Sequence, residues 1–229
     1  MAAPRLLAFK GRMAGKITAL IVQKRNKNRV NVYLDGEFAF GLAAIEAIKL
    51  HKGQTLGEDE IERLRALDAV EQAHERALTL LSYRPRSADE IRQRLGAAGF
   101  SEDAVAAAIE RLTSAGLLDD LAFARYWVES RGQFSPRGAR ALRFELRRKG
   151  IPDAVATEAL GDLDEAALAY HVGRKRLERL RHLDEAAQRK RLGDYLHRRG
   201  FSYEIVSEVL DRLWRGGDQE RDEHKDWEG

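Results

Sequence analysis

The most prominent set of chemically capable side chains in this sequence is a run of cations at helical spacing. It comprises Arg137, Arg140, Arg143, Arg147, Arg148 and Lys149. The first four are three, three and four residues apart, which places their guanidinium groups on one face of an α-helix. Such a face can neutralise phosphates or hold carboxylates in bidentate pairs, so it is our first candidate contact surface. The alternative is a solvated face balanced by acids from another helix.

A second basic set lies further along the chain. It comprises Arg174, Lys175, Arg176, Arg179, Arg181, Arg189, Lys190, Arg191, Arg198 and Arg199. Acids are interleaved with it at Glu178, Asp184 and Glu185, so pairing within the protein is favoured for the individual residues. Taken together, these cations still favour an anionic partner.

Two further arginines flank Pro85. Ser87 follows them and forms a capping box with Glu90, which predicts a helix from position 88 and a structural role for the serine. Arg84 and Arg86 have no evident structural task, so they are also candidate contacts.

A pair of neighbouring carboxylates could suggest a metal site or an acid–base pair. Asp119 and Asp120, however, directly precede the apolar-periodic run 121–128. At such a place carboxylates cap free backbone N–H groups and meet the helix dipole favourably. We therefore expect both to be capping residues. Phe123 and Trp127, four residues apart on this helix, are expected to pack in the core or between units.

The sequence contains no recognisable catalytic constellation. Its six histidines show no metal-ligand spacing, and the absence of cysteine excludes disulfides and thiolate metal sites. Residues 11–17 hold two glycines and a lysine, but the string is one residue short of a phosphate loop and precedes a strand pattern instead of a helix. We expect no catalytic residue, no cofactor and no metal, and hence no enzyme.

The two ends of the chain differ from its body. We interpret residues 1–15 as a flexible basic leader, whose apolar segment is too short for a secretory signal, and no apolar run approaches the length of a membrane span. Residues 217–229 are interpreted as an acidic flexible tail, which makes the remaining body more basic than the net charge of +3 indicates. These features favour a cytoplasmic protein that does not bind membranes. We also expect a monomer, although the sequence itself does not address the oligomeric state.

The elements that position these side chains fall into two kinds. Residues 16–57 hold β-prone runs at 16–22 and 30–34, a tight-turn signal at Asp35-Gly36 and a short helical pattern at 42–50. They predict a small hairpin or three-stranded meander that packs on the following helix. From position 58 onward, helix formers with one apolar stripe dominate.

The helical part repeats itself. Gly99, Gly150 and Gly200 are 51 and 50 residues apart, and each is preceded by a leucine four positions earlier: Leu95, Leu146 and Leu196. Further apolar positions match eight before, one after, ten after and thirteen after each glycine. Glycine suits the left-handed cap that ends a helix. Each copy therefore predicts a helix, a tight turn and a second helix, and a third helix is expected before each pair, at 70–83, 120–131 and 165–181.

The predicted fold class is thus mainly α, with three tandem three-helix units and a small N-terminal meander. We place a linker helix and unit 1 at 58–118, unit 2 at 119–164 and unit 3 at 165–216. Units that each pack on the next are expected to form an elongated, curved rod.

Several strings in the first two units resemble the RecX family signature. They are Arg84-Pro-Arg-Ser87 with Glu90 and Leu95, Gly116-Leu-Leu-Asp-Asp120 with Phe123, Ala124 and Trp127, and Arg131, Gly138 and Glu145-Leu146 leading to Lys149-Gly-Ile151. The resemblance covers residues 70–216 and rests on the order and spacing of the strings. The third unit keeps the apolar frame but not the strings.

The resemblance implies a non-catalytic modulator of RecA. Members are expected to lie in the groove of the RecA filament on single-stranded DNA and to inhibit its recombinase, ATPase and co-protease activities. Arg131 joins the contact candidates on this ground. The rival interpretation is a DNA-binding regulator built from helix-turn-helix-like pairs, which contacts DNA directly through the same arginines.

Overall fold

The structure, a computed structural model, describes the backbone of residues 14–225 and the side chains of residues 14–215. The predicted basic leader lies outside the described residues except for its last two positions. Two compact units are distinguished. The first comprises the described part of Met1–Arg84 together with Ile91–Leu117, and the second comprises Pro85–Glu90 and the described residues from Leu118 onward.

An antiparallel sheet opens the first unit. Its strands are β1 (Gly15–Val22), β2 (Arg29–Leu34), β3 (Glu37–Ala43) and β4 (Thr55–Leu56), in the order β3-β2-β1-β4. The predicted three-stranded meander is confirmed, and the short strand β4 adds to its edge. Val30, Val32 and Leu34 are buried because alternate side chains of β2 face the same side. Asp35 and Gly36 both have positive φ, 48° and 89°, as a two-residue hairpin turn of this kind requires.

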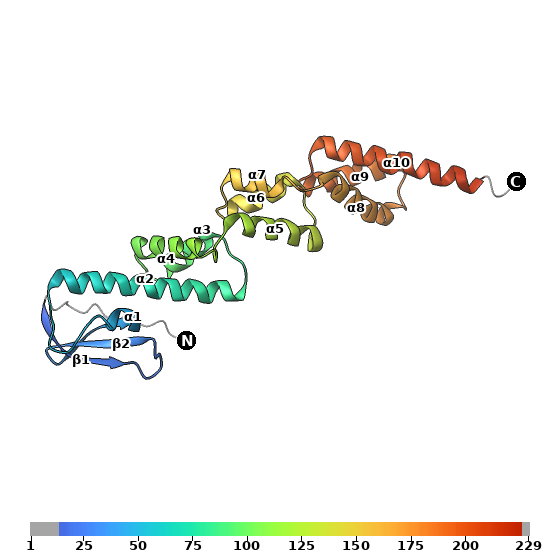
Figure 1. The fold of residues 1–229 in the computed structure, drawn as a ribbon. Helices are drawn as coiled ribbons and strands as arrows, with labels where there is room; N and C mark the ends of the chain where they lie inside the picture. The colour runs from blue at the N-terminus through green and yellow to red at the C-terminus, as the bar shows by residue number, and fades with distance from the viewer. Residues whose placement is uncertain (1–13, 226–229) are drawn as a thin grey trace. The chain divides into compact units, whose positions relative to one another are not determined.

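One long helix packs on this sheet. Helix α1 (Ala44–Ala47) is shorter than the expected 42–50, whereas α2 (Glu58–Tyr83) continues without a break through the predicted linker and the first repeat helix (Figure 1). Ile61 and Leu64 of α2 complete the apolar core of the sheet. The Arg29 guanidinium of β2 donates to the Asp68 carboxylate of α2 at 2.8 Å, and both side chains are nearly buried.

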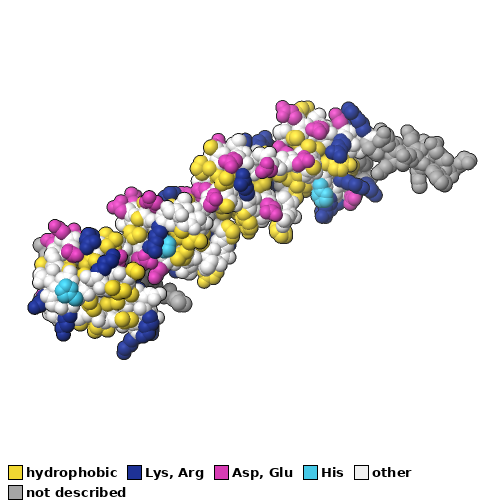
Figure 2. Space-filling view, viewed as in Figure 1, with side chains coloured by type: hydrophobic (Ala, Val, Ile, Leu, Met, Phe, Trp, Pro, Cys, Tyr) yellow, Lys and Arg dark blue, Asp and Glu magenta, His cyan; other side chains and the backbone are white. Residues whose placement is uncertain are grey.

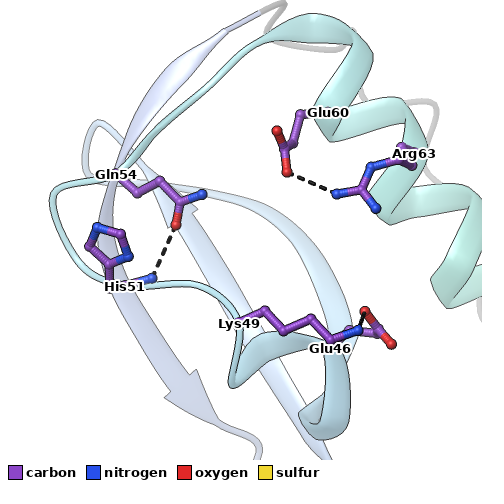
Figure 3. Close-up of polar contacts among 6 residues, drawn as sticks. All are labelled: Glu46, Lys49, His51, Gln54, Glu60 and Arg63. Carbon is purple, nitrogen blue, oxygen red and sulfur yellow. Dashed lines mark hydrogen bonds and ion pairs between the residues drawn. The ribbon is translucent and has the colours of Figure 1, made fainter.

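Figure 3 shows three polar contacts in this part of the first unit, each between residues three positions apart in the sequence. Lys49, just beyond the end of α1, pairs with Glu46 at 2.7 Å, and Arg63 pairs with Glu60 within α2 at 2.9 Å. The backbone N–H of His51 donates to the side-chain carbonyl of Gln54 at 3.2 Å. Pairs of this kind shape a surface and contribute little to stability. These three contacts do not assemble a cluster of reactive or metal-ligating side chains.

Three groups of three helices follow one another. They are α2 with α3 (Ala88–Ala97) and α4 (Glu102–Ser114), then α5 (Asp120–Phe134), α6 (Ala139–Arg148) and α7 (Asp153–Leu160), then α8 (Glu165–Leu177) with the 3₁₀ turn η1 (Glu178–Leu180), α9 (Glu185–Arg198) and α10 (Tyr203–Lys225). The predicted fold class, mainly α with three three-helix repeats, is confirmed. The predicted end of unit 3 at 216 falls inside α10. The curved rod stays a prediction.

The glycine landmarks end their helices as expected. Gly99, Gly150 and Gly200 have φ of 90°, 75° and 90°, in the left-handed region that favours glycine. The residue after each glycine donates its backbone N–H to the carbonyl of the buried leucine five positions earlier, at 3.1–3.3 Å. This bond, with the shorter one from each glycine, defines a Schellman cap. Leu95, Leu146 and Leu196 are fully buried.

In the second unit, these glycine turns also pack against the first residues of a helix from the preceding repeat. The N–H of Gly138, which precedes α6, donates to the carbonyl of Arg199 beside the α9–α10 turn at 3.0 Å. A Cβ on Gly138 would lie 2.4 Å from the carbonyl carbon of Gly200, and a Cβ on Gly200 would lie 2.3 Å from the Cβ of Ala141. Neither glycine can therefore carry a side chain. The two backbones meet directly.

The start of α3, which belongs to the second unit, repeats this arrangement. The Ser87 hydroxyl donates to the carbonyl of Lys149 at 2.6 Å, next to the α6–α7 turn, and also accepts from the N–H of Glu90 at 3.2 Å. A Cβ on Gly150 would lie 2.2 Å from that of Asp89. The capping box predicted at Ser87 thus has a second task, because the serine also ties α3 to the following repeat.

Candidate interaction surface

The cations around α6 do not form one continuous free face. Arg137 precedes the helix, and it and Arg143 are half-buried, each with an Nε atom that has no hydrogen-bond partner among the described residues. Arg140 is exposed but donates to the carbonyl of His197 at 3.2 Å. Arg147 pairs with Asp153 at 3.0 Å, with both side chains 65% exposed. The expectation of four guanidinium groups on one helix face is wrong for Arg137, because α6 begins two residues after it. Arg140, inside α6, is directed toward the next repeat by its contact with His197.

Three predicted residues meet around one carboxylate of the second repeat. The Glu145 carboxylate accepts from the indole N–H of Trp127 at 2.9 Å and from Nε of Arg131 at 2.7 Å. The Arg131 guanidinium and the Lys149 ammonium lie 4.7 and 4.9 Å from the centre of the Trp127 ring. Trp127 packs against the core of its own repeat, as predicted for a packing role. Arg131 and Lys149 therefore have structural tasks beside any contact role.

Arg86 also has a structural task. Its side chain is only 8% exposed and forms an ion pair with Glu90. The expectation that this arginine has none is wrong, because an i, i+4 acid on α3 neutralises it. Arg84 is exposed and makes interactions of its own. Of the two arginines beside Pro85, Arg84 is the better candidate contact.

The two aspartates before α5 cap two different helices. The Asp119 carboxylate accepts from the N–H groups of Leu121 and Ala122 at 2.8 and 3.0 Å, which makes it the N-cap of α5 as predicted. The Asp120 carboxylate instead accepts from the N–H of Ala88, at the start of α3, at 2.8 Å. The expectation that both aspartates cap α5 is therefore wrong for Asp120.

The third repeat contains the equivalent of Asp120. Glu165 is the first residue of α8, as Asp120 is of α5, and it accepts from the N–H of Ala139 at the start of α6 at 3.0 Å. The matching place of these two acids in consecutive repeats is the sequence signal that could have revealed the bond.

The third repeat retains more accessible cations. Arg174 and Lys175 are exposed near the end of α8, and Arg176 is half-buried with its guanidinium 5.0 Å from the Tyr195 ring. Arg199 lies over the same ring at 4.9 Å. Arg148, at the end of α6, is exposed as well. Figure 2 shows basic and acidic side chains interleaved over the visible face.

Sequence reasoning missed one exposed aromatic ring. Phe134, the last residue of α5, is 83% exposed and lines a cleft together with Lys175, Arg176 and Arg199. The sequence does carry a sign of it. Phe134 stands sixteen residues before Gly150, as Tyr83 stands sixteen before Gly99, and each is the exposed last residue of its helix, two positions before a proline.

Within the described residues, no three His, Cys, Asp or Glu side chains are grouped as metal ligands would be. The helices in the described part of the chain also include none long and apolar enough to cross a membrane.

Family models match four successive segments of this chain. The N-terminal domain of regulatory protein RecX matches residues 15–56, and the first, second and third three-helix domains of RecX match 73–112, 119–160 and 163–210. A regulatory protein RecX of Bacillus subtilis is 32% identical over 209 residues, which cover 89% of this chain and 79% of the relative. The chain belongs to the RecX family. The predicted family membership is confirmed.

Other RecX proteins show how much of the chain is shared. The relative from Prosthecochloris aestuarii is 41% identical over 138 residues, which cover 60% of this chain and 91% of the relative. A crystal structure of regulatory protein RecX has a TM-score of 0.73 at 30% identity and covers 86% of this chain and 99% of the other. RecX from Lactobacillus salivarius gives a TM-score of 0.60 at 26% identity over 64% of this chain and 97% of the other.

Proposed function

We propose that this RecX-family chain is a non-catalytic regulator of RecA, which binds the groove of the RecA filament on single-stranded DNA. There it inhibits strand exchange, ATP hydrolysis and co-protease activity. The observation that carries the proposal is the match of all four RecX modules in order along the chain.

The accessible cations indicate where such binding would occur. Arg140, Arg148 and Arg174 are exposed, and none of them has a carboxylate partner among the residues whose side chains are described. Cations of this kind keep their full charge for phosphates or for carboxylates of a protein partner. Arg137 and Arg143 are half-buried and are weaker candidates than the sequence indicated.

Inhibition of RecA ATPase on single-stranded DNA tests this surface. The triple substitution Arg140→Ala, Arg148→Ala and Arg174→Ala is expected to raise the half-inhibitory concentration about tenfold and to flatten its dependence on salt. A control removes the same charge from the exposed β1–β2 loop by Lys24→Ala, Arg25→Ala and Lys27→Ala. Equal loss in the control would assign the effect to net charge and remove this surface from the mechanism.

Binding to bare DNA separates the proposal from its rival. We expect affinity for RecA-coated single strands to exceed affinity for the bare strand. If the two affinities are equal and RecA ATPase is untouched by the added protein, direct DNA binding replaces filament regulation. The same assay in Mg²⁺ reports strand cleavage, which would contradict a non-catalytic role.

A further inference from the structure

A cleft in the second unit brings cations from two helices and a 3₁₀ turn to an exposed aromatic ring. Its walls come from the end of α5, from α8 with η1 and from α9, and they include Phe134, Lys175, Arg176, Arg179, Tyr195 and Arg199. The cleft encloses about 330 Å³. This volume lies at the lower end of the range for small-ligand sites, roughly 300–1,000 Å³.

The charge of this cleft is not balanced by its walls. No carboxylate within the described part of the chain lines it. Among the residues whose side chains are described, Lys175, Arg176 and Arg179 have no ion-pair partner. The C-terminal ends of α5, α8 and α9 lie here and supply roughly half a negative charge each, about 1.5 in total. Four cations exceed that, so the cleft keeps a positive surplus.

The Arg176 and Arg199 guanidinium groups are fixed in place. Both lie over the Tyr195 ring, and Arg199 also donates to the carbonyl of Pro136 at 2.8 Å. The Nε of Arg176 is buried without a hydrogen-bond partner among the described residues. A ring keeps a cation in position without neutralising it. The site is therefore preorganised for an anion.

An apolar hollow adjoins the cleft. It shares Gly132, Gln133 and His171 with the cationic cleft. Apolar side chains such as Val128 and Leu163 line it beyond them, and the charged residues Arg125, Glu129, Asp162 and Asp164 complete its lining. Gly132 stands inside α5, where glycine weakens a helix relative to alanine, yet a Cβ there would meet nothing within 4 Å. Packing does not require this glycine. The space it leaves is open to a ligand.

We propose that this cleft binds a nucleotide unit, with its phosphate among the four cations of the cleft and its base on the Phe134 ring. Phosphate and a flat apolar base together match the two halves of the site, whereas inorganic phosphate would leave the ring and the apolar hollow unused. Aromatic stacking with cationic support is how proteins hold single-stranded nucleic acid without sequence preference. The unit can belong to such a strand or to a free nucleotide. This inference is independent of the proposed function, because it needs no recombinase.

Fluorescence anisotropy of the full chain with a labelled five-residue oligothymidylate tests the site. Phe134→Ala is expected to weaken binding about 5- to 100-fold, and its control is the exposed Phe144→Ala. Lys175→Ala with Arg179→Ala is expected to weaken binding about tenfold and to lower the salt slope by about 1.4. Lys190→Ala with Arg191→Ala removes the same charge from exposed positions of α9 and is expected to leave binding unchanged. Gly132→Leu places a side chain between the cationic cleft and the adjoining hollow, both of which Gly132 lines, and should also weaken binding.

Competition identifies the source of the nucleotide. Displacement of the probe by equimolar ATP would assign a free nucleotide, and resistance to ATP would assign a strand; either supports the site. Two results would overturn it: binding unchanged by Phe134→Ala and by the Lys175/Arg179 pair, or displacement by hexaglutamate that does not depend on Phe134. The second result would make the cleft a dock for an acidic peptide.

Discussion

The second and third repeats place their cations in different surroundings. In the second, carboxylates receive them: Arg131 pairs with Glu145, Arg147 with Asp153 and Arg125 with Glu158. In the third, rings alone support Arg212 at Tyr170 and Arg176 at Tyr195. Arg189 lies over Trp214 but also pairs with Asp211. An ion pair neutralises a cation, whereas a ring leaves its charge intact. Repeats with similar helices can therefore present different electrostatic surfaces.

The largest effect is expected where the two repeats meet. Gly200→Ala combines a left-handed backbone with a Cβ only 2.3 Å from the Ala141 Cβ, so we expect a loss of about 3 kcal/mol in unfolding free energy. Gly116→Ala is the control, because its φ is also positive but its Cβ would meet nothing within 4 Å. It should cost about 1 kcal/mol. Urea unfolding followed by far-UV circular dichroism measures both losses. Equal losses would contradict the close packing of Gly200 against the start of α6.

Removing the shared carboxylate of the second repeat should have the next largest effect. Glu145→Ala leaves the Trp127 N–H and the Arg131 guanidinium without their acceptor, at about 1–2 kcal/mol for partly exposed groups. Urea unfolding measures this loss, and the tryptophan fluorescence, to which Trp214 and Trp227 also contribute, should change with it. A variant as stable as the parent would mean that the carboxylate does not hold these side chains together.

The aromatic support of the third repeat should be worth less. Tyr195→Leu keeps apolar bulk but removes the ring under Arg176 and Arg199, so we expect a loss of about 1 kcal/mol. Urea unfolding at low and high salt compares it with Glu145→Ala. If the tyrosine variant loses more than the glutamate variant, the ranking of the two repeats is reversed.

The first unit offers a smaller, pH-dependent effect. Burial lowers the pKa of His74, and the neighbouring Arg111 lowers it further. The unfolded chain then takes up the proton first, so this histidine destabilises the fold as the pH falls below about 6.5 toward the lowered pKa. Unfolding in urea at pH 7.5 and 5.5 should show a smaller drop in stability for His74→Leu than for the parent. An equal drop would assign the pH dependence to other groups.

The repeats could be predicted from the sequence because their signals are local. A leucine four positions before a glycine specifies a buried contact and a left-handed cap within one turn, as at Leu146 and Gly150. Asp119 was predictable for the same reason. The family strings added the order of the modules.

The candidate site was less predictable because its contacts join distant positions. Arg86 lies inside the protein, and Asp120 caps α3 instead of its own helix. Whether a cation meets an acid, a ring or water depends on which helices pack together. Spacing along one helix does not encode that.

The first residues of α3 and α6 contact turns that lie later in the sequence, and this order has a consequence for synthesis. Ser87 finds its carbonyl partner 62 residues further along the chain, at Lys149. Gly138 likewise pairs with Arg199. A chain that leaves the ribosome from its N-terminus therefore exposes the start of α3 until the next repeat has emerged, and the same delay recurs for α6. Each repeat therefore completes its contacts only after the next repeat has been translated. A nascent chain stopped after Arg148 would lack the acceptor for its own Ser87.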